Sequence, residues 1–225
     1  MDVVYRRQEE LLSTEQLTFP VSIVGAGGIG SPTALALAKL GCERIVVYDP
    51  DRVEPHNLPN QLYGPSDLGR YKVDALGDII ERLTGARLGR SANRVLVADF
   101  SGVVILAVDT MSTRSAIWSS SIRLRPQVEL LVDARMGGEV GRILAVNPTD
   151  PDDIAVYEAS LHDDDTATAD ACLVQAVGYS TLAIAGLVAS IIRKHAIGVR
   201  PPVETFVDLT TVTLLSRLRR GGALG

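Results

Sequence analysis

Aromatic residues and cysteines are both scarce in this chain. Aromatic side chains make up only 4% of its 225 residues, so the core must be built mainly from Ala, Val, Leu and Ile. Such a core favours helices packed on a parallel sheet over a β-sandwich. The two cysteines lie far apart and form no CxxC pair. We therefore expect free thiols, no disulfide framework and no zinc site.

No stretch has the composition of a targeting or membrane-spanning segment. Residues 1–7 carry charges with no apolar run behind them, which argues against a signal peptide. Polar and glycine residues interrupt the most apolar stretch, 172–192, so we expect a buried helix there. The net charge of −5 argues against nucleic acid as a main partner. These features predict a cytoplasmic protein without membrane contact.

The order of apolar runs and turn residues predicts an α/β fold. A strand at 21–24, a helix at 31–40 and a strand at 45–48 form a first βαβ unit. We expect further elements as helices at 66–83 and 112–124 and as strands at 94–98, 103–108, 129–132, 140–146, 203–209 and 212–218. The result is a Rossmann-like, mostly parallel sheet with helices on both faces and an antiparallel C-terminal extension.

No linker or repeat divides the chain, so residues 1–225 are predicted to form a single domain. Within it, residues 1–18 are expected to form an N-terminal helical arm, with an amphipathic helix over 3–17. Residues 147–171 contain two prolines and many acids. They are predicted to form a long irregular crossover segment of the functional or mobile kind.

A glycine cluster follows the first strand. Residues 25–30 read Gly-Ala-Gly-Gly-Ile-Gly and match GxGxxG between a strand and a helix. The glycines allow a tight turn and close backbone approach to phosphates, and the helix start presents free N–H groups to an anion. Asp49 ends the next strand, where it can accept hydrogen bonds from ribose hydroxyls. We predict a nucleotide site, but the motif does not separate NAD, FAD and ATP.

Segments later in the chain help to distinguish between these nucleotides. An acidic stretch with a polar loop covers 49–61, a glycine and a lysine fall within 69–72, and an acid and an arginine fall within 106–114. Here the chain resembles the ThiF/MoeB/HesA family, related to ubiquitin-activating enzymes. That family has a glycine turn, D-x-D-x-V, an N-L-N-R-Q-like loop, G-x-x-K and D-x-x-x-x-R. The order and spacing agree over nearly the full chain, and 132–138 and 206–208 also look like family elements.

The resemblance implies roles for particular residues. Asp49 binds the ribose, Asn57 and Lys72 contact the phosphates, and Asp109 holds a magnesium ion. The expected nucleotide-binding set is Gly25, Gly27, Gly28, Gly30, Asp49, Asp51, Asn57, Gln61 and Lys72. Charge physics supports these roles, because a carboxylate attacking an α-phosphate brings two anions together. Lys72 can equally be a solvated helix lysine and Arg114 a helix-surface residue, whereas Asp109 stands at a strand tip on the ligand face.

Two further catalytic candidates come from the same resemblance. Family members use an arginine from the neighbouring subunit's N-terminal R-Q segment, and Arg7-Gln8 matches it, which implies a homodimer with a shared site. The alternative is a charged face of a terminal helix. Cys172 corresponds to a cysteine that binds the activated partner covalently in sulfur-transferring relatives. The interpretation of Cys172 as a small buried residue under a helix is favoured over this role, and Cys42 is interpreted as structural.

The chain departs from the family in one loop. Pro59 and Asn60 stand where the family has a polar residue and an arginine. Asn60 donates hydrogen bonds but carries no charge, so either transition-state stabilisation is weaker or Arg52 or Arg70 substitutes for the missing cation.

The leading functional hypothesis is ATP- and magnesium-dependent adenylation. The C-terminal carboxylate of a ubiquitin-like or sulfur-carrier protein ending in Gly-Gly attacks the α-phosphate and gives an acyl-adenylate and pyrophosphate. One alternative is a nucleotide-binding subunit with little catalysis of its own. Another is an NAD(P)-dependent oxidoreductase, which the glycine turn and Asp49 alone would allow.

Overall fold

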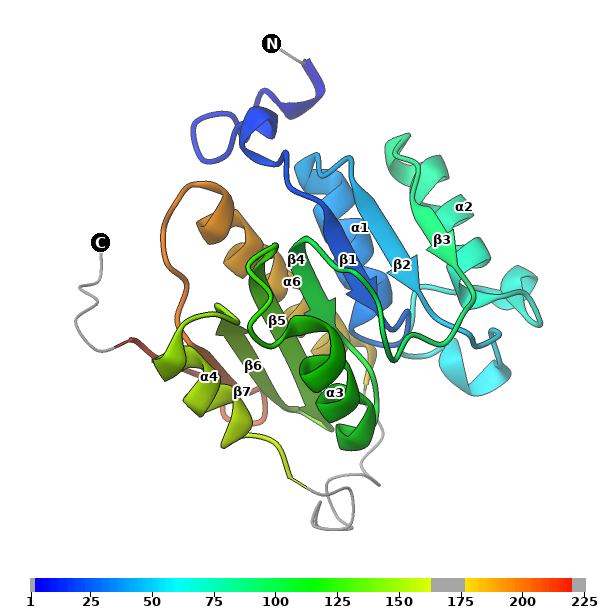
Figure 1. The fold of residues 1–225 in the computed structure, drawn as a ribbon. Coiled ribbons are helices and arrows are strands. Elements are labelled where there is room, and N and C mark those ends of the chain that lie inside the picture. The colour runs from blue at the N-terminus through cyan, green and yellow to red at the C-terminus, as the bar shows by residue number, and fades with distance from the viewer. Residues whose placement is uncertain (1–2, 163–176, 220–225) are drawn as a thin grey trace.

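A computed structural model of the chain describes residues 3–162 and 177–219 (Figure 1). The described strands form one sheet in the order β3-β2-β1-β4-β5-β6-β7-β8. The strands are β1 (Val21–Val24), β2 (Ile45–Tyr48), β3 (Gly89–Ser91), β4 (Gly102–Leu106), β5 (Val128–Gly137), β6 (Val140–Val146), β7 (Glu204–Asp208) and β8 (Thr213–Arg217). The helices are α1 (Gly30–Leu40), α2 (Lys72–Thr84), α3 (Met111–Ile117), α4 (Pro151–Glu158) and α6 (Gly178–Ala196).

The sheet changes direction at β5. Strands β3, β2, β1, β4 and β5 are parallel, and β5 to β8 pair antiparallel. This confirms the predicted Rossmann-like sheet with its antiparallel extension. The chain leaves β1 toward β2 on one side and reaches β4 on the other, so a topological switch point lies between β1 and β4. Ligands of such sheets bind at the carboxyl ends of the strands beside this point.

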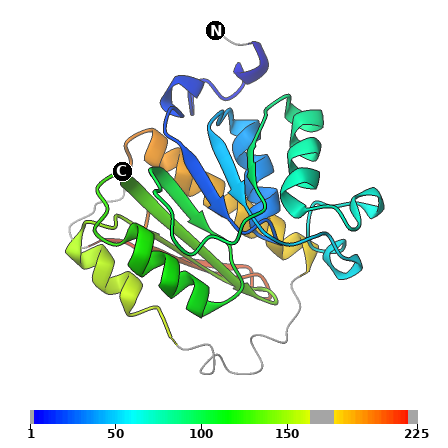
Figure 2. The ribbon, with the colours of Figure 1, turned by 45° about the vertical axis from the view of Figure 1, so that its right-hand side comes forward.

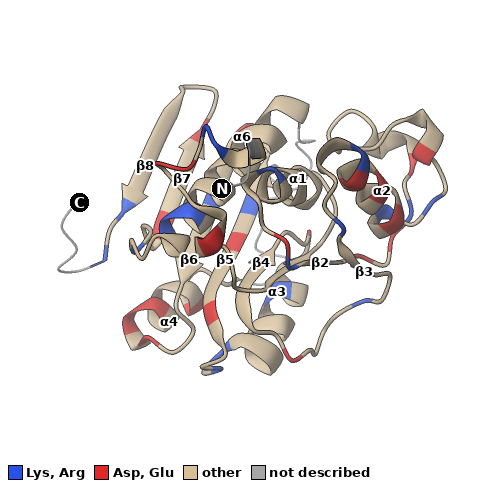
Figure 3. Cartoon of the chain, turned by 90° about the horizontal axis from the view of Figure 1, so that it is seen from above, with Lys and Arg blue, Asp and Glu red and all other residues tan. Residues whose placement is uncertain are grey.

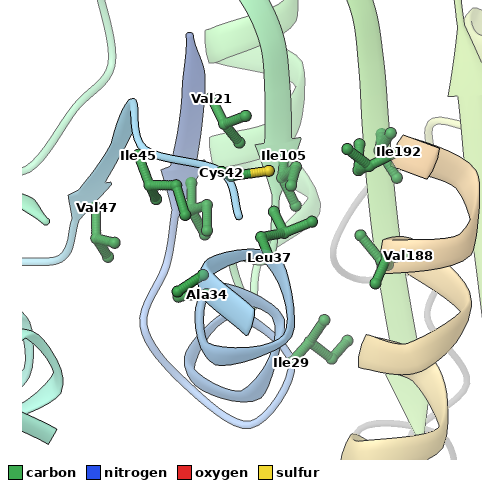
Figure 4. Close-up of a cluster of buried hydrophobic side chains, with 14 of the residues drawn as sticks. Val21, Ile29, Ala34, Leu37, Cys42, Ile45, Val47, Ile105, Val188 and Ile192 are labelled. Carbon is green, nitrogen blue, oxygen red and sulfur yellow. The ribbon is translucent and has the colours of Figure 1, made fainter. Parts of the chain in front are cut away.

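Helices cover the sheet on both faces. On one face α1, α2 and α6 share a core with β1, β2 and β5, in which Leu37 of α1 lies near Val188 and Ile192 of α6 (Figure 4). The other face is covered by α3 and α4 (Figure 2). These helices enclose a second core that contains Trp118 and Tyr157. Helices α1 and α6 carry few charges, in keeping with their packing against each other, whereas α2 carries charges of both signs (Figure 3).

The first βαβ unit agrees with the prediction. α1 ends where Gly41 adopts a left-handed φ of 99°, a conformation that favours glycine.

The predicted helix at 112–124 is also present, because Trp118–Ile122 extends α3 as a π-helical turn. The predicted strands after it are also present, and β5 runs to Gly137, well beyond the expected end at residue 132.

The predicted N-terminal helix is wrong. The arm consists of turns and two short 3-10 helices, Val3–Tyr5 and Thr14–Gln16. Isolated helices of this length are marginal in water, so tertiary contacts decide the conformation. Here Leu12 and Leu17 are buried in the core, and Ser13 caps the second turn by accepting from the Glu15 amide. These anchors hold the arm in an irregular path.

Two other predictions require correction. The apolar run 94–98 forms no strand, because Gly89–Ser91 pairs with β2 instead and Val97 is left exposed. The segment 147–162 is not irregular, since it contains α4. Asp150 caps this helix by accepting from the amides of Asp152 and Asp153, and Pro151 occupies its first turn. Proline and aspartate are common in loops, but both are also favoured at helix starts. The aspartate side chain accepts free backbone amides there, and a proline in the first turn lacks an N–H that would have no partner in any case.

The rest of the predicted crossover segment, 163–171, and Cys172 lie outside the described residues. Within the described ranges, no helix is both long and apolar enough to cross a membrane.

Candidate functional site

A cleft of about 960 Å³ opens at the carboxyl ends of β1, β2 and β4. The glycine turn forms its floor, and the loop after β2 and the start of α2 form one wall. The β4–α3 connection and the β5–β6 hairpin form the other wall. Of the residues expected to bind a nucleotide or act in catalysis, those that line the cleft are Gly25, Gly27, Gly28, Asp49, Asp51, Asn57, Gln61, Lys72, Asp109 and Arg114.

The glycines of the turn differ in what a side chain at each position would contact. Gly25 has a φ of 100°, and a Cβ there would lie 2.4 Å from the Ala107 carbonyl oxygen. A Cβ on Gly30 would lie 1.8 Å from the carbonyl oxygen of Gly25, so this glycine permits close packing of helix and strand rather than lining the cleft. Gly27 differs, because its nearest neighbour would be Gln61 Nε2 at 4.0 Å. The fold itself leaves the space above Gly27 open.

Asp49 fixes the turn from the neighbouring strand. Its Oδ2 accepts the Ala26 amide at 2.6 Å and its Oδ1 accepts the Asp51 amide at 2.8 Å, while only 5% of the residue is exposed. Tyr63 adds a bond of 2.7 Å to the Ala26 carbonyl, and burial raises its pKa, so the hydroxyl keeps its proton. Each Asp49 oxygen retains acceptor capacity for a hydroxyl in the cleft.

The polar loop after β2 presents amide groups to the cleft. Asn57 is buried, and its Oδ1 accepts the Glu54 amide at 2.9 Å, which fixes the turn and leaves its NH₂ group for other partners. The Gln61 Oε1 is buried and has no hydrogen-bond partner among the described residues. A buried acceptor without a partner costs free energy, so this atom suits a ligand or water donor.

Lys72 is not a solvated helix lysine. It begins α2, only 9% of its side chain is exposed, and its Nζ lies 2.9 Å from Asp51 Oδ2. The pairing keeps a buried cation at the wall of the cleft.

Arg52 and Arg70 do not supply the missing family cation, which corrects that expectation. Arg52 lies 3.9 Å above the ring of Tyr71 and donates to the Gly69 carbonyl. Arg70 pairs with Asp67 and Asp78 on the outer surface. Neither arginine lines the cleft.

Asp109 stands at the tip of β4 with an exposed side chain. Its carboxylate makes no hydrogen bond or ion pair with the part of the chain that the structure describes. The next residue, Thr110, caps α3 by accepting the Thr113 amide. A hard divalent cation such as Mg²⁺ takes one or two carboxylates and completes its shell with phosphate oxygens and water. Asp109 fits that requirement as a single open carboxylate, beside a turn that leaves room for phosphates.

Arg114 is not a helix-surface residue. It is 4% exposed, and its guanidinium donates to Asp133 and to the Val108 carbonyl. Asp133 is fully buried and also accepts Arg135 Nε at 3.0 Å and the Tyr157 hydroxyl at 3.0 Å. Burial and the nearby carboxylate raise the pKa of Tyr157, so it remains a donor. Two guanidiniums share one carboxylate here and leave net positive charge at the cleft.

Sequence reasoning gave no role to Arg135, although it fell within the family-like segment 132–138. The missed signal is the spacing of Asp133 and Arg135, because residues two apart on a strand share one face of the sheet. Arg94, Arg142 and His162 also line the cleft without having been predicted. Arg94 lies in the β3–β4 connection, Arg142 on β6 and His162 after α4, all distant from the glycine turn in sequence.

Arg7 lies far from its own cleft. Its exposed side chain borders a hollow at the C-terminal ends of α1 and α2, together with Lys39 and Arg82. This edge carries the amino ends of the parallel strands, opposite the glycine turn (Figure 1). Arg7 is therefore not part of the cleft of its own chain.

Metal-ligating side chains are sparse. In residues 3–162 and 177–219, no group of three or more His, Cys, Asp or Glu side chains is placed to hold a metal ion.

Cys42 is structural, and its thiol is expected to be inert in the native protein. It is 3% exposed, and burial raises its pKa to about 12. Because the thiolate is the reactive species, modification at pH 8 should be slowed by more than about 1,000-fold relative to the unfolded chain. A Cys172→Ser variant isolates Cys42 for labelling with a chromogenic disulfide reagent, with the same variant in denaturant as control. Rapid native labelling would contradict the buried position.

The strand order and the glycine turn define a Rossmann-like α/β protein with its site at the switch point. The sequence model of the ThiF family matches residues 6–220, so the chain belongs to the ThiF family.

Individual proteins show the same relationship. Over 153 residues the chain is 32% identical to "Adenylyltransferase and sulfurtransferase MOCS3" of Anopheles gambiae, covering 60% of this chain and 34% of that protein. It is 29% identical over 161 residues to "Sulfur carrier protein ThiS adenylyltransferase" of Escherichia coli, covering 65% and 59%. The chain thus spans less than two thirds of the length of these curated relatives.

Solved structures share the fold. E. coli MccB, crystallised with ATP, superposes with a TM-score of 0.72 over 97% of this chain and 71% of that chain, at 14% identity. PaaA superposes with a TM-score of 0.68 at 20% identity, over 91% of this chain and 65% of that chain. At these identities the likeness establishes the architecture alone.

Proposed function

We propose that this protein is an adenylyltransferase that binds ATP in the cleft and transfers AMP to a carboxylate. The observation that carries the proposal is the convergence, in one cleft, of the open Gly27 backbone, the buried Lys72 and the unpartnered Asp109 carboxylate. These groups come from three separated segments, and each suits one part of a nucleoside triphosphate. Membership of the ThiF family and the names of its adenylyltransferase relatives support the same reaction.

The proposed binding mode follows from the donors and acceptors. Asp49 accepts ribose hydroxyls with its remaining lone pairs, while the α1 start and the glycine turn bring amide groups to the phosphates. Lys72 and the Asn57 amide group extend this set toward the phosphate chain. Asp109 would hold the magnesium ion, which when bound neutralises phosphate charge.

The protein's own residues supply the remaining conditions for reaction. A carboxylate is a poor electrophile, and attack of its oxygen on the α-phosphorus forms an acyl-phosphate bond while the bond to pyrophosphate breaks. Two anions must approach each other, so preorganised cations lower the barrier. Lys72 and the Arg114–Asp133–Arg135 cluster place positive charge along the cleft before substrate arrives.

We propose a carrier protein ending in Gly-Gly as the acyl substrate. The cleft wall formed by β5 and β6 includes Gly137, which has no side chain to obstruct a narrow, extended chain end. The E. coli relative is named for a sulfur carrier protein, and MccB was crystallised with MccA, which supports a polypeptide substrate. The reaction is proposed to occur in the cytoplasm.

We further propose that the active unit is a homodimer in which Arg7 serves the partner's cleft. Its distance from the cleft of its own chain supports this arrangement. Cys172 stays a candidate acceptor of the activated acyl group, and it lies outside the described residues.

The decisive experiment is ATP–pyrophosphate exchange with a small carrier protein ending in Gly-Gly. Asp109→Ala is expected to lower the exchange rate by about 100-fold or more, since transition-state charge loses its counter-ion site. Asp109→Asn, which keeps the shape without the charge, should lose nearly as much. Exchange by Asp109→Ala at the unaltered rate would overturn the assignment.

One observation favours a second function. Pro59 and Asn60 leave the loop after β2 without the family arginine, so the protein can instead be a nucleotide-binding subunit that needs a catalytic partner. Calorimetric ATP binding with no exchange by the isolated chain would favour this alternative. Tighter binding of NADH than of ATP would instead support a dehydrogenase.

A further inference from the structure

The Arg114 side chain links two parts of the cleft wall. One guanidinium nitrogen donates to Asp133 on β5, and the other donates to the Val108 carbonyl and lies 3.4 Å from the Ala134 carbonyl. With 4% of the residue exposed and its donors directed into the protein, it has little capacity left for a ligand. Arg114 therefore holds the segment after β4 against β5.

The point that Arg114 holds is adjacent to Asp109. On the amino side, the Val108 carbonyl is bound by the guanidinium. On the carboxyl side, Thr110 accepts the Thr113 amide at 3.3 Å and lies 2.7 Å from the Thr113 hydroxyl oxygen. The backbone of Asp109 is therefore fixed on both sides, while its carboxylate has no partner among the described residues.

We propose that Arg114 is a positioning residue that acts on the reaction through Asp109. Asp133 holds the guanidinium in place, because it is fully buried and also bonded to Arg135 and Tyr157. The rigid fork of an arginine reaches the carboxylate and the carbonyl together, which the single ammonium of a lysine does not. Misplacing a reacting or charge-stabilising group by about 1 Å can cost about 100-fold in rate. This inference rests on the proposed function, because the role of Asp109 is measured through ATP–pyrophosphate exchange.

Arg114→Lys keeps the charge opposite Asp133 and gives up the second contact. We expect exchange to fall about tenfold, and we expect the gain in ATP affinity on adding Mg²⁺, measured by calorimetry, to lie between that of the wild type and that of Asp109→Ala. ATP affinity without the metal should stay within about twofold of the wild type. In the Asp109→Ala background, Arg114→Lys should cost less than about twofold more in exchange, because its target is already gone.

Arg219→Lys is the matched control. Arg219 is a partly buried arginine, with 13% of its side chain exposed, that pairs with the buried Asp153 at 2.7 Å and donates to two backbone carbonyls, but it does not line the cleft. It should lower thermal stability by an amount similar to Arg114→Lys and leave metal-dependent ATP affinity unchanged.

Two results would overturn the positioning role. One is an equal loss from Arg114→Lys with and without Asp109, and the other is weaker ATP binding in the absence of metal, which indicates direct phosphate contact. Either result leaves the proposed function standing if Asp109→Ala alone abolishes exchange. Full exchange by Asp109→Ala defeats the proposed function instead.

Discussion

Gly27→Ala is expected to weaken ATP binding by about 10- to 100-fold while leaving the fold intact. The fold places nothing closer than Gln61 Nε2, at 4.0 Å, to a Cβ at this position, and Gly27 is not among the residues with positive φ. The added methyl group would instead occupy the space where phosphates approach the backbone. Overpacking costs roughly 1–3 kcal/mol, and each 1.4 kcal/mol is about tenfold in affinity.

Calorimetric titration with ATP measures the loss of affinity. Urea unfolding of the same variant tests whether the fold stays intact. Gly30→Ala is the matched control, because its Cβ would collide with the Gly25 carbonyl and it should unfold the protein or destabilise it strongly. If Gly27→Ala binds ATP as tightly as the wild type, the phosphates do not lie over this turn.

Asp133→Ala is expected to lower the free energy of unfolding by about 3–5 kcal/mol. Asp133 is fully buried, and its removal leaves Arg114 and Arg135 without a counter-ion, together with a Tyr157 hydroxyl without its acceptor. Breaking a buried pair from one side is costly, since the remaining charge stays desolvated. Urea denaturation checks the value, provided that the m-value is unchanged.

Glu81→Ala supplies the comparison for an exposed pair. Glu81 pairs with Arg87, whose side chain is 85% exposed, and such pairs contribute about 0–1 kcal/mol. A loss at Asp133 no greater than the loss at Glu81 would mean that the buried cluster contributes little to folding.

The short-range patterns predicted most of the fold. Val21–Val24 and the glycine turn are specified by neighbouring residues, because a buried strand needs continuous apolar residues and a tight turn needs glycine. The antiparallel strand at Val140–Val146 was predicted from its position after Gly137-Gly138. The failures came where local signals are ambiguous. The run at 94–98 has strand composition without a strand partner, and Pro and Asp at 150–151 serve a helix start as well as a loop.

The candidate site was also predicted in part. The positions of Asp49, Lys72 and Asp109 in the cleft followed from the resemblance and from strand ends, because the carboxyl ends of parallel strands meet at one edge. The partners of these residues did not follow. That Lys72 faces Asp51, and that Arg114 is bound inward rather than exposed, depends on packing between helices and strands that are distant in sequence.

The sequence by itself determined the class of sheet, the glycine turn and the acids at the strand tips, since each depends on the periodicity and backbone freedom of a few consecutive residues. Only the tertiary structure decided which charges are shared. It brought Arg114 and Arg135 onto the single carboxylate of Asp133 and left Asp109 open, and it carried Arg7 to the far edge of the sheet. Burial and pairing of charges are set by the whole surrounding structure, so no local pattern contains them.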